Sequence, residues 1–115
     1  MHLAIVDGYI GNEGAVHIIS YLRRNTTLRI LSLKSNNIGL IGAQAIGNLL
    51  ETTSTLKRID LSDNYIGYDG LNAIALSLRK NSTLISITVD ASYTDQLDVA
   101  VAKNDFAIKY LSPGL

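Results

Sequence analysis

The sequence has few of the residues that usually perform chemistry. Its 115 residues include no Cys, no Trp, one Pro and two His. Without Cys there are no disulfides, thiolate metal sites or Cys nucleophiles. A reduced compartment fits this composition best, so we expect a cytoplasmic protein. No apolar run approaches the ~18 residues of a membrane span, and no basic segment followed by an apolar run marks a signal peptide. We therefore expect no membrane association.

The sequence has no excess of positive or of negative charge. Ten Lys and Arg balance ten Asp and Glu. Nucleic acids and anionic membranes attract proteins with a cationic surplus, so we expect no nucleic-acid partner. Apolar residues make up 47% of the chain and charged residues 17%, which indicates a folded chain. The length suits a single domain spanning 1–115.

A period of 28 residues organises the chain. Residues 28–55 and 56–83 are identical at 11 of 28 positions, most of them apolar, Gly or Asn. The same columns extend upstream through 1–27, a repeat that lacks its first position, and they decay downstream. We interpret 84–115 as a degenerate repeat followed by a C-terminal cap, with a docking segment for a partner as the alternative for this tail.

Each repeat predicts a strand followed by a helix. The first half alternates apolar and polar residues, which indicates a strand with one buried face. The second half has apolar residues at steps of three and four, which indicates a helix with one apolar stripe. A pair of Gly lies between them, as at Gly39 and Gly42. These pairs predict a tight turn with positive φ or a close approach of the backbone.

The repeat resembles a known motif. Residues 28–38 read L-x-x-L-x-L-x-x-N-x-I, and residues 56–66 read L-x-x-I-x-L-x-x-N-x-I. This pattern resembles the leucine-rich-repeat signature, and the 28-residue length with its I-G-x-x-G turn is similar to the ribonuclease-inhibitor-like subclass. The resemblance covers about 1–94. It implies an α/β solenoid, a short horseshoe arc with parallel strands on the concave face and helices on the convex face.

Two sets of Asn are predicted to have structural roles. The motif residues Asn36 and Asn64 should form a ladder whose side-chain amides satisfy turn backbone groups buried between repeats. Asn25 and Asn81 begin formal N-glycosylation acceptors, Asn-Thr-Thr and Asn-Ser-Thr. Because both triplets fall where a helix gives way to the next strand, we interpret them as turn chemistry.

The outward positions of the strands are the candidate protein-binding surface. Lys34, Ser62 and Asp90 share one outward column, and neighbouring columns add an acidic centre and a basic edge. The alternative interpretation is a solvated face with no ligand. The candidate residues are Arg29, Lys34, Lys57, Arg58, Asp60, Asp63 and Asp90.

An aromatic column follows the Asn ladder. It contains Tyr9, Tyr65 and Tyr93, with Asn37 in the same column. Tyr residues are favoured as interface anchors. The alternative, which the sequence favours, is that these rings pack along the loop surface.

The sequence lacks a catalytic constellation. His2 lies on a predicted strand and His17 on a predicted helix, and neither a phosphate-binding Gly loop nor a Ser with a suitable base is present. We predict no catalytic residues, no metal and no cofactor. The resulting hypothesis is a non-catalytic protein–protein interaction module, acting as a scaffold or as a subunit of a larger assembly. The alternatives are a regulator of an enzyme, of the inhibitor or GTPase-activating type, and a recognition domain of a larger receptor or effector.

The first repeat is predicted to have an open side. Leu3 and Ile5 already occupy core columns, with no helix before them to cover them. An exposed strand edge beside apolar surface invites pairing. We therefore expect a protein partner, or a second copy of the chain, over the N-terminal repeat edge.

Overall fold

Strands and helices alternate between residues 2 and 90 in the computed structural model, which describes residues 1–90 and 110–114. The three helices of the described residues have 12 or 13 residues, and the first three strands have three residues each. In order, the elements are β1 (His2–Ala4), α1 (Gly11–Leu22), β2 (Ile30–Ser32), α2 (Leu40–Thr52), β3 (Arg58–Asp60), α3 (Gly67–Leu78), β4 (Ser86–Asp90) and β5 (Tyr110–Gly114).

The strands form one parallel sheet in the order β1-β2-β3-β4-β5. Across the first three pairs, partners lie 28 residues apart, as in Leu3 with Leu31, Leu31 with Ile59, and Ile59 with Ile87. The sheet register therefore reproduces the sequence period. β5 pairs with β4 at a different offset, with Tyr110 opposite Ser86. The sequence predicted a C-terminal cap in this part of the chain, but no strand.

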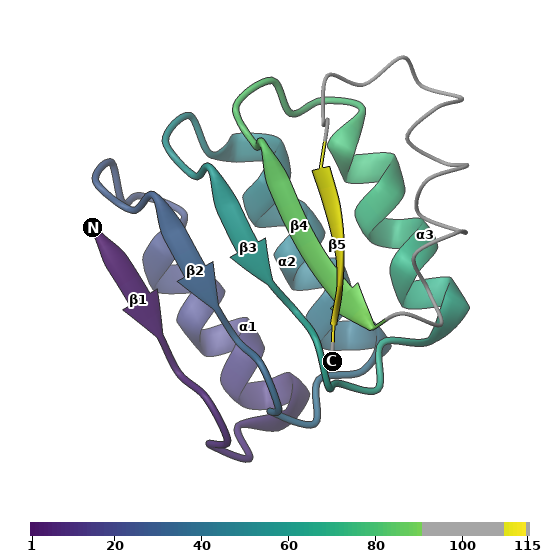
Figure 1. Cartoon of the computed structure of the whole chain (residues 1–115). Helices are drawn as coiled ribbons and strands as arrows, with labels where there is room; N and C mark the ends of the chain where they lie inside the picture. The colour runs from purple at the N-terminus through teal and green to yellow at the C-terminus, as the bar shows by residue number, and fades with distance from the viewer. Residues whose placement is uncertain (91–109, 115) are drawn as a thin grey trace.

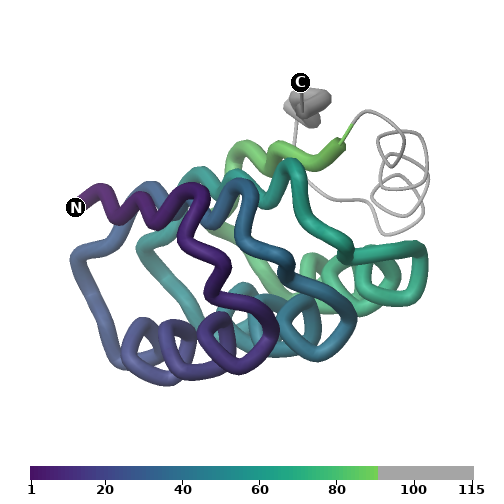
Figure 2. Tube along the Cα trace, turned by 90° about the horizontal axis from the view of Figure 1, so that it is seen from below, coloured from purple at the N-terminus to yellow at the C-terminus, as the bar shows by residue number. Residues whose placement is uncertain are grey.

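The molecule has two layers, with the strands on one side and the helices on the other (Figures 1 and 2). Paired strands lie about 4.8 Å apart, whereas packed helices need about 8–10 Å. The strand layer is therefore the inner side of the curve. This arrangement is the α/β solenoid expected from the repeat. None of the helices in the described part of the chain is long and apolar enough to cross a membrane.

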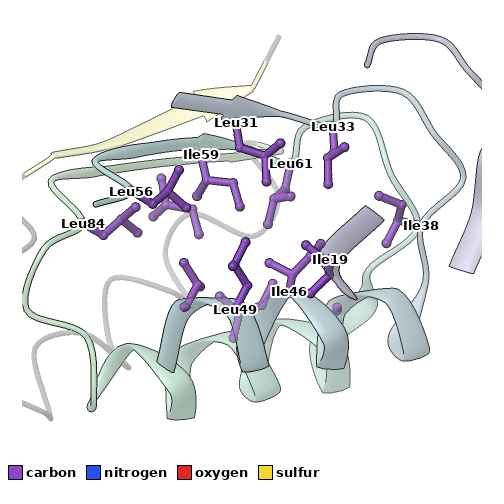
Figure 3. Packing of buried hydrophobic residues seen from close by; sticks show 14 of the residues in the cluster. Ile19, Leu31, Leu33, Ile38, Ile46, Leu49, Leu56, Ile59, Leu61 and Leu84 are labelled. Carbon is purple, nitrogen blue, oxygen red and sulfur yellow. The ribbon is translucent and has the colours of Figure 1, made fainter. Parts of the chain in front are cut away.

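The core lies between the layers and consists of the repeat columns (Figure 3). Leu33 is 0% exposed and Leu61 is 1% exposed, so their predicted burial is confirmed. In the first repeat, by contrast, the corresponding side chains are only partly buried. These are Leu3, Ile5, Ile10 and Ile18.

The second Gly of the two later pairs, Gly42 and Gly70, allows adjacent helices to approach closely. A Cβ on Gly70 would lie 2.6 Å from Cγ2 of Ile66 and 3.1 Å from Cβ of Ala43, which is on the neighbouring helix. The first Gly has positive φ in two of the three turns, as predicted, with 68° at Gly67. Gly39 departs from the prediction because its φ is −112°.

Candidate functional site

The Asn ladder holds the loops between strands and helices in place. The Nδ2 atom of Asn64 donates to the backbone oxygens of Leu33 and Leu61, both at 3.0 Å. Its Oδ1 accepts from the backbone N–H groups of Asn36 and Ile38, also at 3.0 Å. Both Asn side chains are buried. They satisfy buried backbone groups, so their amides are not available to a ligand.

Asn36 serves the preceding loop in the same way. Its Oδ1 accepts from the backbone N–H of Gly8 at 2.8 Å, and its Nδ2 donates to the backbone oxygens of Ile5 and Lys34. Gly8 occupies the Asn position of the first repeat and has no side chain to extend the series. The ladder therefore consists of two rungs, each binding the loop of the repeat before it.

The formal glycosylation triplets form turns, as predicted. Oδ1 of Asn25 accepts from the backbone N–H groups of Thr27 at 2.9 Å and Leu28 at 2.6 Å. Oδ1 of Asn81 accepts in the same way from Thr83 at 3.0 Å and Leu84 at 2.7 Å. The side chain of Asn81 is also buried and donates to a backbone oxygen of the preceding repeat.

The residue before each ladder position has left-handed backbone. Asp7, Ser35 and Asp63 have φ values of 56°, 60° and 56°. Short polar residues tolerate this conformation better than other non-Gly residues. The hydroxyl of Ser35 donates to Oδ2 of Asp63 at 2.6 Å, which links two of these loops. These three residues occupy one repeat column and form a row of short polar side chains just after the ends of the strands.

The predicted acidic centre is engaged within the protein. Oδ1 of Asp60 accepts from the backbone N–H of Ser62 at 2.9 Å and from its hydroxyl at 2.7 Å. Oδ1 of Asp90 accepts from the backbone N–H of Asp63 at 2.7 Å. The structure therefore connects Asp63 with Asp90, while Asp60 holds its own turn.

The outward placement predicted for Ser62 is wrong. Its side chain is buried. Strand β3 ends at Asp60, so the alternation of the strand does not continue to Ser62, and the hydroxyl turns back to the carboxylate of Asp60.

The predicted cations separate into two places. Arg29, Lys57 and Arg58 lie where strands β2 and β3 begin, and Nη1 of Arg29 donates to the backbone oxygen of Thr55 at 3.4 Å. Lys34 follows the other end of β2 and is partly buried. It is therefore not part of the same basic group.

A hollow of about 140 Å³ lies among the loops that leave the strands. It brings together the column of Asp7, Ser35 and Asp63 and the predicted aromatic column. The side chains of Tyr9 and Tyr65 are 80% and 74% exposed, so they do not pack into the loop surface. Tyr93 lies outside the described residues. The hollow is lined by Asp7, Tyr9, Ser35, Asn37, Asp63 and Tyr65.

Three residues of this hollow were not predicted as site residues. Asp7 and Ser35 share a repeat column with the candidate Asp63, and Asn37 shares one with Tyr9 and Tyr65. The alignment of the repeats therefore already placed these three residues beside the candidate residues. It was missed because the prediction concentrated on the strands, whereas the hollow is formed by the loops that follow them.

The loop edge, which comprises 5–13, 33–41 and 61–69, concentrates exposed apolar side chains. Of the eleven large apolar side chains that are exposed in the described part of the chain, six lie on this edge. Its charged residues are four acids and one base, Lys34. The six apolar residues are Val6, Tyr9, Leu40, Ile41, Tyr65 and Tyr68.

A structural residue that the sequence alone did not identify lies on the loop edge. Oδ1 of Asn12, on α1, accepts from the backbone N–H groups of Gly39 and Gly42, both at 2.8 Å. It therefore caps the start of α2, which has no side-chain cap of its own. The repeat gave no signal, because the corresponding positions are Leu40 and Tyr68.

The described residues contain no group of three or more His, Asp or Glu that is placed to hold a metal ion. The arrangement at the loop edge is one of exposed aromatic rings beside carboxylates. Such a surface suits contact with another macromolecule.

Comparison with known proteins agrees with the fold. A family model described as "Leucine Rich repeat" matches residues 24–47 and 53–75. Among solved structures, a chain named "Leiomodin-1 Actin-Binding Site 2 (ABS2)" is similar, with a TM-score of 0.85 and 20% sequence identity. The similarity covers 99% of this chain and 70% of that chain. No curated protein matches the sequence. The chain thus carries leucine-rich repeats that are folded as an α/β solenoid.

Proposed function

We propose that this chain is a non-catalytic protein-binding module that serves as a scaffold or a subunit, and that the loop edge is its contact surface. The observation that carries this proposal is the pair of exposed rings, Tyr9 and Tyr65, on one hollow with two carboxylates. An exposed Tyr ring leaves apolar surface in contact with water and does not pack in the core. Binding a partner at this surface would remove the two rings from water.

The structural neighbour that is named for a binding site supports the general function. The leiomodin-1 chain is named for an actin-binding site, so a solenoid of this shape can serve in protein binding. Because a structural similarity at 20% identity indicates a shared fold and not a shared partner, we do not propose actin as the partner of this chain. The 28-residue period favours the ribonuclease-inhibitor-like subclass, and the lack of Cys favours a cytoplasmic location.

The proposal is tested by removing the two rings. Tyr9→Asn introduces the residue that the repeat itself has at position 37, where Asn37 shares the left-handed backbone of Tyr9. Tyr65 is exposed and packs in no core, so the double variant Tyr9→Asn/Tyr65→Asn should stay folded. In quantitative affinity capture from the source organism, proteins held by the wild type should be depleted about 30-fold, as for two interface anchors that together contribute ~2 kcal/mol.

The matched control is Leu76→Ala, which removes an exposed apolar side chain from α3, away from the loop edge. It should capture the same proteins as the wild type. If the Tyr double variant also retains every one of them, the loop edge is not the contact surface.

A further inference from the structure

Most of the charged residues within 1–90 are segregated between two edges. All three helices run in the same direction, so their C-terminal ends lie at one edge together with the starts of the strands (Figure 1). We call 23–30, 51–58 and 79–86 the turn edge. It contains seven of the eight Lys and Arg within 1–90 and one acid, Glu51. The seven bases are Arg23, Arg24, Arg29, Lys57, Arg58, Arg79 and Lys80.

Part of this segregation has a structural reason. The N-terminal end of a helix carries partial positive charge and the C-terminal end partial negative charge, so acids at the first and bases at the second are stabilising. Glu51 also forms an ion pair with Lys80 at 3.8 Å. These interactions account for single charges, but they do not explain why a hollow forms between two repeats at this edge.

That hollow has a volume of about 570 Å³ and lies where α1 and α2 end. Its size falls within the roughly 300–1,000 Å³ of clefts that accept ligands. The side chain of Tyr21 is 83% exposed at its rim. The described residues offer no hydrogen-bond or ion-pair partner to the guanidinium groups of Arg23 and Arg24. The hollow is lined by Ser20, Tyr21, Arg23, Arg24 and Thr52.

We propose that the turn edge, centred on this hollow, binds a carboxylate-rich segment of a protein partner. Two adjacent guanidinium groups present paired donors that match the geometry of carboxylates. The exposed ring of Tyr21 adds apolar contact area. The hydroxyls of Ser20 and Thr52 donate to backbone oxygens of their own helices, so they are left to accept from backbone N–H groups of the peptide.

An acidic peptide suits this edge better than a long polyanion. The chain has no net charge, and the loop edge is acidic, so an extended nucleic acid or an anionic membrane meets repulsion as well as attraction. Nucleic-acid surfaces also use series of stacking rings, whereas this hollow has a single Tyr. A short acidic peptide can contact the turn edge without reaching the acidic loop edge, so it avoids this repulsion.

The site is independent of the loop edge, so the two proposals fail separately. The test measures binding of a fluorescent deca-glutamate peptide by anisotropy, first at about 0.01 M and then at about 0.15 M ionic strength, where screening shortens from ~30 Å to ~8 Å. The variant Arg23→Gln/Arg24→Gln lowers the net charge by two. The control Gln44→Glu/Asn72→Glu lowers it equally at exposed positions in the middle of α2 and α3.

The wild type should bind the peptide at low ionic strength and lose affinity as salt rises. The Arg variant should bind about tenfold more weakly, as for a few screened charge pairs, while the control changes by less than about twofold. Circular dichroism should show that both variants keep the wild-type helix content.

Three results would overturn the proposal. The first is the absence of binding at low ionic strength. The second is an equal loss in both variants, which would reduce the effect to net charge. The third is tighter binding of duplex DNA or of phosphatidylserine vesicles than of the peptide, with the same dependence on Arg23 and Arg24.

Discussion

Single residues decide how well the loops are held. Asn64 makes hydrogen bonds to backbone groups of two successive loops from a position that is nearly closed to water. An apolar residue of similar size would fill the same space but leave those groups without partners. Backbone groups at this depth are costly to leave unsatisfied.

Asn64→Ala should therefore destabilise the protein strongly. The backbone N–H groups of Asn36 and Ile38 would both lose their acceptor, and a loss of ~1–3 kcal/mol for each buried unsatisfied group gives a total of about 2–6 kcal/mol. Urea unfolding followed by circular dichroism measures the change. Asn72→Ala, at an exposed position of α3, is the control and should change stability by less than about 0.5 kcal/mol. Equal midpoints for both variants would contradict the structural role of Asn64.

The Leu columns give a second expectation at this scale. Leu33→Ala or Leu61→Ala should each cost about 2–5 kcal/mol, because each side chain is enclosed between the strands and the helices. Differential scanning calorimetry of the two variants tests this. An unchanged melting temperature in both would show that the register of the repeat is wrong.

At the scale of elements, the helices depend on their neighbours for their ends. None of the three has a side-chain cap from its own N-cap residue. In α2 the missing cap is replaced by Asn12 of α1. The cap of α2 is therefore a contact between two repeats and not a contact within one, so the start of α2 depends on the position of α1.

Asn12→Ala should loosen the start of α2 more than any other element. A lost helix cap costs about 0.5–2 kcal/mol. Hydrogen exchange should show the amides of Gly39 and Gly42 losing protection first, because these N–H groups lose their acceptor. Gln44→Ala, at an exposed position of the same helix, should leave their exchange unchanged. Uniform exchange changes across the whole chain would contradict a local capping role.

The whole molecule is a stack with an incompletely covered first repeat. The N–H groups of Ile5 and Asp7 donate to β2-side oxygens at 3.0 and 3.2 Å. Because successive N–H groups of a strand point in opposite directions, those of Ala4 and Val6 face the unpaired side of β1. The half-buried Leu3 lies beside them. A strand edge of this kind favours association.

The isolated chain should therefore associate as its concentration rises. Sedimentation velocity over a wide range of concentration measures this. Ala4→Lys places a charge on the exposed residue of β1 and should shift the chain toward monomer. A wild-type monomer at every concentration, with the amides of Ala4 and Val6 protected from exchange, would rule out an open edge.

The sequence by itself determined the features that repeat. The strand alternation, the helix stripe and the 28-residue period fix which side chains face the core, because these depend on local geometry that each repeat shares. The Leu columns, the Asn ladder positions and the sheet register could all be predicted for this reason. The tail strand could not, because its pairing offset departs from the period.

Only the tertiary structure decided the surfaces. The capping by Asn12, the burial of Ser62 and the two hollows arise between residues of different repeats or beyond the end of a strand, where the chain bends and alternation stops. Likewise, the sequence shows balanced charge, whereas the parallel helices place seven of the eight bases within 1–90 on the turn edge and four acids on the loop edge. The physical reason is that the period specifies the inside of each repeat, while the direction and contacts of the outer side chains are set by the stacking.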